Sequence, residues 1–120
     1  MIFSSKNEDG VPKWKQVLDG TATVTRRLKP VKVGRVYAVQ PNRCKKAVCY
    51  IRIKSCVKHS EWFENICNTV GFSSIKKQFN VLQKESKLEG FGDWSFLLDF
   101  FENKKIEISD TYRIEFEVVK

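Results

Sequence analysis

The segment GTATVTRR, residues 20–27, places hydroxyl and guanidinium groups close together in a short β-branched stretch. If it forms a strand, the side chains of Thr23, Thr25 and Arg27 share one face, because alternate residues of a strand point to the same side. The apolar residues between them lie with Arg26 on the opposite face, which is expected to point inward. Arginine offers a fixed fork of donors that suits phosphate and other planar anions. The polar face is therefore either ordinary solvated surface or the lining of a cleft.

A second group of cations lies in PNRCKK, residues 41–46, where proline and asparagine favour an exposed turn. Its basic residues are Arg43, Lys45 and Lys46. Such a loop could follow a nucleic-acid backbone through its phosphates. Tyr37 and Tyr50, on strands expected nearby, could stack on bases, although such tyrosines are more often partly buried.

Positive charge is concentrated in one part of the chain. Residues 13–58 contain thirteen lysines and arginines against one acid, Asp19, whereas residues 59–120 contain eight basic and eleven acidic residues. The net charge of +8 therefore comes from the first segment, which carries +12. This separation favours a partner rich in phosphate or other anions, while the alternative is that the lysines only aid solubility.

The cysteines do not follow the pattern of a metal site. Cys44, Cys49, Cys56 and Cys67 lack the close pairs of a zinc finger or ribbon. A mixed site that includes His59 is disfavoured for the same reason. We expect no metal, no other cofactor and, in a cytoplasmic protein, no disulfide.

The length allows one core and is too short for two, so a single domain over residues 1–120 is expected. No apolar run approaches the roughly 20 residues that span a bilayer, so no membrane partner is expected. The N-terminus lacks a basic start followed by an apolar stretch, which argues against a secretory signal. The expected location is therefore the cytoplasm.

The hydrophobic pattern predicts a mixture of helices and strands. In chain order we expect a helix over 11–18, strands over 21–27, 36–39 and 47–57, a helix capped by Ser60, helices that begin at Ser74 and Asp93, and a strand over 112–119. This order favours an α+β fold on a small antiparallel sheet or barrel. Return of the last strand to the early ones would remove an exposed edge.

Four segments together resemble the ASCH domain family, whose members share the PUA-like β-barrel. They are VLDGTATVTRRL, VKVGRVYAV, LEGFGDWSFLLDFF and YRIEFEVV, and the resemblance spans residues 13–119. It implies a small PUA-like mixed or antiparallel β-barrel with flanking helices. It also implies a cleft between the barrel and the first helix, and a function related to RNA.

The resemblance further implies a candidate set of catalytic residues. In ASCH members similar to acetylcytidine amidohydrolases, a lysine, the second threonine of the motif and a distant glutamate form the catalytic group. Thr25 matches this threonine, Glu89 matches the glutamate and Arg27 matches the motif arginine, but Ala22 occupies the lysine position. A methyl group can neither accept a proton nor stabilise an oxyanion, so the sequence leans against an enzyme. Other lysines that could supply an ammonium are Lys13, Lys15 and Lys29.

The sequence thus predicts an RNA-binding ASCH domain with a basic cleft for single-stranded RNA or a nucleoside. Its expected nucleic-acid-binding residues are Thr23, Thr25, Arg26, Arg27, Arg43, Lys45 and Lys46. One alternative is a hydrolase that acts on modified nucleosides, or a ribonuclease, with Thr25 and Glu89 as catalytic residues. If Glu89 instead faces Arg27, it is a structural partner. A third interpretation is a protein-interaction module that uses the acidic helical half.

Overall fold

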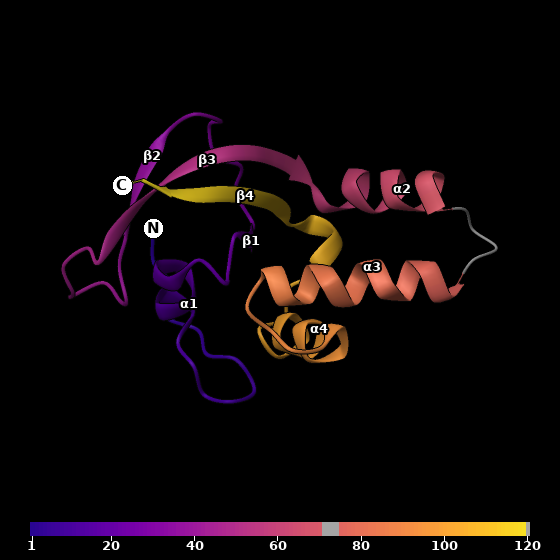
Figure 1. Ribbon diagram of the computed structural model, residues 1–120, viewed down its shortest axis with the longest axis horizontal. Helices are drawn as coiled ribbons and strands as arrows, with labels where there is room; N and C mark the ends of the chain where they lie inside the picture. The colour runs from indigo at the N-terminus through magenta and orange to yellow at the C-terminus, as the bar shows by residue number, and fades with distance from the viewer. Residues whose placement is uncertain (71–74, 120) are drawn as a thin grey trace.

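A computed structural model describes residues 1–70 and 75–119 (Figure 1). In chain order the elements are α1 (Lys13–Asp19), β1 (Val24–Arg27), β2 (Val36–Val39), β3 (Cys49–Lys58), α2 (His59–Val70), α3 (Ile75–Leu88), α4 (Trp94–Asn103), a 3₁₀ turn (Ile108–Asp110) and β4 (Tyr112–Val119). The bounds of β2 and β4 are those predicted. Ser60 lies inside α2 instead of capping it, and Ser74 lies outside the described residues.

The strands form one antiparallel sheet in the order β1-β4-β3-β2. The predicted α+β class and antiparallel sheet are therefore confirmed, and β4 returns to β1 as expected. Closure into a barrel is not seen, because β1 and β2 lie at opposite edges and do not pair with each other within the described ranges. The sheet is open.

The N-terminal segment occupies part of the β2 edge. The Phe3 amide donates to the Gln40 carbonyl (2.9 Å), and the Gln40 amide donates to the Met1 carbonyl (3.0 Å). Each edge strand has only four residues, so few backbone groups remain for a direct β1–β2 pairing. This gives a physical reason why the edges stay apart.

The main core lies on the sheet face that α1 covers. Alternate residues of β3 and β4 point into it, among them Ile51, Ile53, Ile114 and Phe116. Val17 of α1 packs against these side chains and is fully buried. Burying one such large apolar side chain contributes about 1.5–3 kcal/mol. The core therefore fixes α1 against the sheet.

The remaining helices extend beyond one end of the sheet. Figure 1 shows β3 running into α2, with α3 beside α2 and α4 beside α3. The end of α3 returns to the sheet, where the Thr23 amide donates to the Leu88 carbonyl (2.9 Å). This return brings Glu85 of α3, and Glu89 just after it, to Arg26 of β1. No described helix is both long and apolar enough to cross a bilayer.

Candidate functional site

A pocket of about 230 Å³ lies where the N-terminal segment, α1, β1, the connection between α3 and α4 and the end of α4 meet. The charged side chains on its wall are Lys13, Arg26, Arg27, Glu89 and Lys104. Its aromatic side chains are Phe3, Phe91, Phe100 and Phe101. The pocket therefore combines aromatic side chains with several charges in a small space.

Glu89 is held at the pocket by the turn that ends α3. Gly90 adopts a φ of +91°, and the Phe91 amide donates to the Ser86 carbonyl (2.9 Å), which closes the helix in a Schellman motif. The Gln16 side-chain amide of α1 donates to the Gly90 carbonyl (2.8 Å). Glu89 thus follows a helix end that is fixed against α1.

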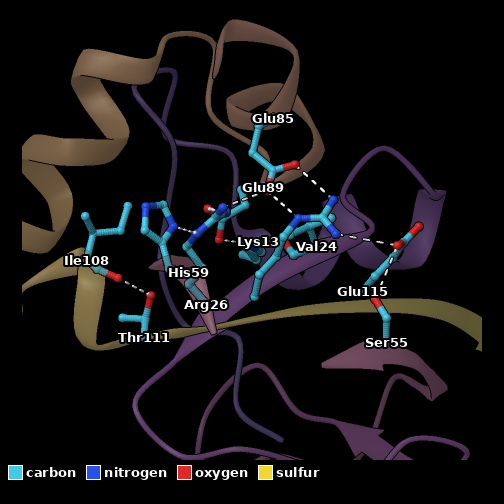
Figure 2. Close-up of polar contacts among 11 residues, drawn as sticks. Lys13, Val24, Arg26, Ser55, His59, Glu85, Glu89, Ile108, Thr111 and Glu115 are labelled. Atoms are coloured by element: carbon cyan, nitrogen blue, oxygen red, sulfur yellow. Dashed lines mark hydrogen bonds and ion pairs between the residues drawn. The ribbon is translucent and has the colours of Figure 1, made fainter. Parts of the chain in front are cut away.

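Arg26 is the centre of a buried polar network (Figure 2). Its Nη1 donates to Glu89 Oε2 and its Nη2 to Glu85 Oε2, each at 2.7 Å, while Nε donates to His59 Nδ1 at 3.0 Å. Glu85 lies in the last turns of α3 and Glu89 follows the helix directly, and both carboxylates point toward the guanidinium. The guanidinium also lies over the Trp62 ring, 4.8 Å from its centroid. All three nitrogens of Arg26 therefore have partners inside the protein.

Glu85 connects two arginines. Its carboxylate also accepts hydrogen bonds from Arg113, at 2.6 Å from Nε and 3.0 Å from Nη2. Burial acts to raise the pKa of Glu85, but the hydrogen bonds from Arg113 and the charge of Arg26 outweigh it, so the pKa lies below its usual value. Glu85 is thus ionised at neutral pH.

His59 is the neutral member of the network. Burial lowers the pKa of His59 to about 4, and the charge of Arg26 acts in the same direction. Because Nδ1 accepts the hydrogen bond from Arg26, the ring proton is assigned to Nε2. The imidazole packs among Trp62, Phe63 and Trp94. These contacts assign His59 a structural part in orienting Arg26.

Lys13 brings an ammonium into the pocket from α1. Its Nζ donates to the Val24 carbonyl (2.9 Å) and lies 3.9 Å from Glu89 Oε1. Burial lowers the pKa of Lys13 to about 8, although the charge of Glu89 opposes the shift. Lys13 is four residues before Val17 and shares its buried helix face. That spacing was the available sequence signal that Lys13, of the three alternative lysines, points inward.

Ala22 points elsewhere. Its side chain is buried in the main core with Phe3 and Val17 and is not part of the pocket wall. Ala22 instead lines a second hollow together with Thr23 and Lys54, so this position supplies no group to the pocket. The ammonium beside Thr25 and Glu89 instead comes from α1.

Arg27 lies on the pocket wall, and no carboxylate of the described residues forms an ion pair with it. Its Nη2 donates to the Ile2 carbonyl (2.6 Å), and the guanidinium lies over the Phe3 ring, 4.8 Å from its centroid. Its buried Nε has no hydrogen-bond partner in the described part of the chain. Burial lowers the pKa of Arg27, and the charge of Glu89 acts against this. Glu89 is ion-paired with Arg26, not with Arg27.

The structure brings together only some of the predicted site residues. Thr25, Arg26, Arg27 and Glu89 all line the pocket. Thr23 lines a separate hollow together with Lys54 and Glu115. The basic-loop residues, which we define as Arg43, Lys45 and Lys46, are exposed and do not line the pocket.

The described residues contain no cluster of three or more histidine, cysteine, aspartate or glutamate side chains that could hold a metal. All four cysteines are free thiols. The groups that line the pocket are thus an ammonium, a guanidinium, a carboxylate, a hydroxyl and aromatic side chains.

The chain was compared with protein-family models, with curated proteins and with solved structures, and none of them matches it.

Proposed function

We propose that the pocket binds a nucleoside or one unstacked base of a single-stranded RNA. The observation that carries this proposal is the convergence of Lys13, Thr25, Arg27 and Glu89 on a pocket with aromatic walls. Base edges present both donors and acceptors, and these four side chains supply complements to each. Base faces stack on aromatic rings whatever the base. The pocket is smaller than the about 300–1,000 Å³ of sites for drug-sized ligands, which suits a small planar group.

The charge distribution favours RNA as the source of that base. The basic-loop residues are exposed and free to contact phosphates outside the pocket. Sequence-dependent recognition of RNA usually needs bases that are not paired, which favours single-stranded or locally unpaired RNA. The pocket would then contact the base, and the basic-loop residues would contact the phosphate backbone.

We also propose that the chain is a relative of the ASCH family and its PUA-like barrel, with a sheet that stays open. The support is positional: the segments that carry the resemblance contribute Thr25, Arg27 and Glu89 to one pocket. The β4–β1 pairing, which would be one step of barrel closure, is compatible with this kinship.

A second candidate function is hydrolysis of a modified nucleoside. It is favoured by the Lys13 ammonium, which lies 3.9 Å from Glu89, shares the pocket with Thr25 and has a pKa of about 8. A lysine with such a pKa is partly neutral near physiological pH and is able to act as a general base. Incubation with acetylated cytidine, and with unstructured RNA to test ribonuclease activity, would reveal turnover. Turnover that Lys13→Met, Thr25→Val and Glu89→Gln each abolish would establish an enzyme.

The binding proposal is tested by titrating labelled single-stranded RNA at low and high salt. We expect micromolar binding that weakens steeply with salt, as several phosphate contacts require. Arg27→Ala should cost ~1–3 kcal/mol of binding free energy, the range for a charge-assisted hydrogen bond. Arg52→Ala is the control, because Arg52 is exposed on β3 outside the pocket, and should cost less and mainly at low salt. Absence of binding, or equal losses that vanish at high salt, would overturn the proposal.

A further inference from the structure

We infer that the pocket holds a phosphate group at Arg27, so that its preferred ligand is a nucleotide or a terminally phosphorylated RNA and not an unphosphorylated nucleoside. This inference rests on the proposed function of the same pocket. It adds the anionic half of the ligand, and it is carried by the charges on the pocket wall.

The wall carries more positive than negative charge. Four cations line it, Lys13, Arg26, Arg27 and Lys104, against the single carboxylate of Glu89. That carboxylate is already engaged by Arg26 at 2.7 Å and faces Lys13 at 3.9 Å. Behind the wall, Glu85 is shared between Arg26 and Arg113. The described carboxylates around the pocket therefore already pair with other cations. They do not balance the charges of Arg27 and Lys104.

Arg27 is the cation with the clearest need for an anion. None of the ion pairs within the described ranges includes it. Among residues 1–70 and 75–119, its buried Nε has no acceptor, and its Nη2 donates to the Ile2 carbonyl, a neutral group. A guanidinium does not lose its proton in proteins, and Arg27 is partly buried, so a partner of opposite charge would stabilise it. A phosphate oxygen would supply both the missing acceptor and the missing charge.

The other groups around this position fit the same ligand. Lys104 follows α4, and its Nζ lies over the Phe100 ring, 4.5 Å from the centroid, at the pocket wall. Lys13 is faced by Glu85 of α3, by Glu89 just after α3, and by Arg26 and Arg27 of β1. Burial and the two arginines lower the pKa of Lys13 to about 8 against the pull of the two glutamates. A bound phosphate would stabilise the protonated amine of Lys13. The affinity of the pocket for phosphate should therefore fall as the pH rises from 7 to 9 and the amine loses its proton.

The inference is tested by calorimetric titration with three kinds of ligand. They are the common ribonucleosides, the corresponding 5′-monophosphates and inorganic phosphate alone. For the base that the pocket accepts, we expect the monophosphate to bind about tenfold more tightly than the nucleoside, as one charge-assisted contact provides. Inorganic phosphate should compete with the monophosphate, and the preference should decrease between pH 7 and pH 9.

Two substitutions and a control locate the phosphate. Arg27→Gln should remove most of the preference for the monophosphate, and Lys104→Gln, at an exposed position that does not endanger folding, should reduce it in part. Arg52→Gln removes an equal charge outside the pocket and should leave the preference intact.

The outcomes separate this inference from the function on which it rests. If nucleosides and RNA bind but the monophosphates bind no more tightly, the phosphate site is wrong and the proposed function stands. Competition by inorganic phosphate without any contribution from the nucleoside, and without RNA binding, would leave an anion site and overturn the proposed function. If no ligand binds, both are wrong.

Discussion

Arg26 is buried in the structure, although arginine side chains usually lie at the protein surface. The sequence predicts that Arg26 shares the inward face of its strand with Ala22 and Val24, and the structure confirms that all three are buried. The sequence also predicts nucleic-acid contact by Arg26. Its partners Glu85 and Glu89 lie 59 and 63 residues away in the chain, so no local pattern could reveal them. A buried guanidinium with two carboxylates and an imidazole is mainly an internal support of the pocket.

The first prediction concerns Glu85, which accepts hydrogen bonds from both Arg26 and Arg113. Glu85→Gln should lower the free energy of unfolding by about 3–5 kcal/mol, because it leaves buried positive charge without its partner. Chemical denaturation monitored by tryptophan fluorescence measures the loss. Glu115→Gln is the matched control: Glu115 pairs with the same Arg113, but at 3.6 Å and with its side chain 38% exposed. It should cost no more than about 1 kcal/mol, and equal losses would show that the network does not carry the stability assigned to it.

The second prediction concerns the acid sensitivity that His59 introduces. The unfolded chain protonates His59 near pH 6.5, whereas the folded protein does so only near pH 4. Between these values the unfolded state binds more protons, so the free energy of unfolding should fall as the pH drops from 6.5 to 4. Protonation of Glu85, whose pKa is lowered in the folded protein, also lowers the free energy of unfolding, but only below about pH 4.5.

The variant His59→Asn separates the two effects. The asparagine Oδ1 lies where Nδ1 does, so it can accept the hydrogen bond from Arg26 Nε, but it does not titrate. Urea denaturation at several pH values should give a flatter profile between pH 6.5 and 4.5 for this variant than for the wild type. Profiles of equal slope would mean that another group titrates in this range.

At the scale of elements, the pocket depends on the turn between α3 and α4. Gly90 has a φ of +91°, and a Cβ at this position would clash with the side-chain amide of Gln16. The third prediction is that Gly90→Ala destabilises the protein more than Gly34→Ala, where φ is +88° but a Cβ meets no atom within 4 Å. Both variants carry the strain of a positive φ, about 1–2 kcal/mol. Only the first disturbs the hydrogen bond from Gln16 to the turn.

That additional loss should be about 1 kcal/mol, the usual net contribution of a hydrogen bond. Thermal and chemical denaturation of the two variants give the comparison. In addition, Gly90→Ala should weaken nucleoside binding, because the turn positions Glu89, whereas Gly34→Ala should not. Equal effects of the two variants on stability and binding would show that the turn does not position the pocket.

Local patterns predicted the elements better than they predicted their assembly. The bounds of β2 and β4 follow from clean alternation of apolar and polar residues, and α4 begins directly after Asp93 as expected. Closure of the barrel would require β1 to pair with β2, the two edge strands. The alternation of apolar and polar residues does not show which strands pair. Lys13 was among three open alternatives, and only its spacing from Val17 favoured an inward position. Predictions therefore succeeded where a signal lies within a few residues.

At the scale of the whole molecule, a single RNA ligand would contact both the pocket and the positively charged surface outside it. The excess of positive charge lies in residues 13–58, which include α1, the first three strands and the exposed basic-loop residues. The molecule is elongated, 47 × 31 × 26 Å, and its helices α2 and α3 extend away from the sheet (Figure 1). We therefore expect RNA to bind at the sheet end of the molecule.

The fourth prediction tests this division between pocket and loop. Replacing Arg43, Lys45 and Lys46 together by glutamine should reduce the salt dependence of RNA binding, by a slope of about 0.7 for each phosphate of a single strand that the loop no longer neutralises. Nucleoside affinity should not change, because these side chains do not line the pocket. A matched triple replacement of Lys76, Lys77 and Lys84, which are exposed on α3, should leave the salt dependence nearly unchanged. Equal effects of the two triple variants on the salt dependence would mean that RNA binding depends only on the net charge of the protein.

The most direct test of the central claim is residue-resolved NMR of the isotope-labelled protein during titration with nucleosides and their monophosphates. We expect saturable shifts of the backbone amide signals of Lys13, Thr25, Arg27 and Phe91, all of which line the pocket. The amide signals of Tyr50 and Arg52, on the outer side of β3, should stay in place. Shifts confined to the basic-loop residues and the outer side of β3, or the absence of saturable shifts for every ligand, would contradict the claim that this pocket binds a nucleoside or nucleotide.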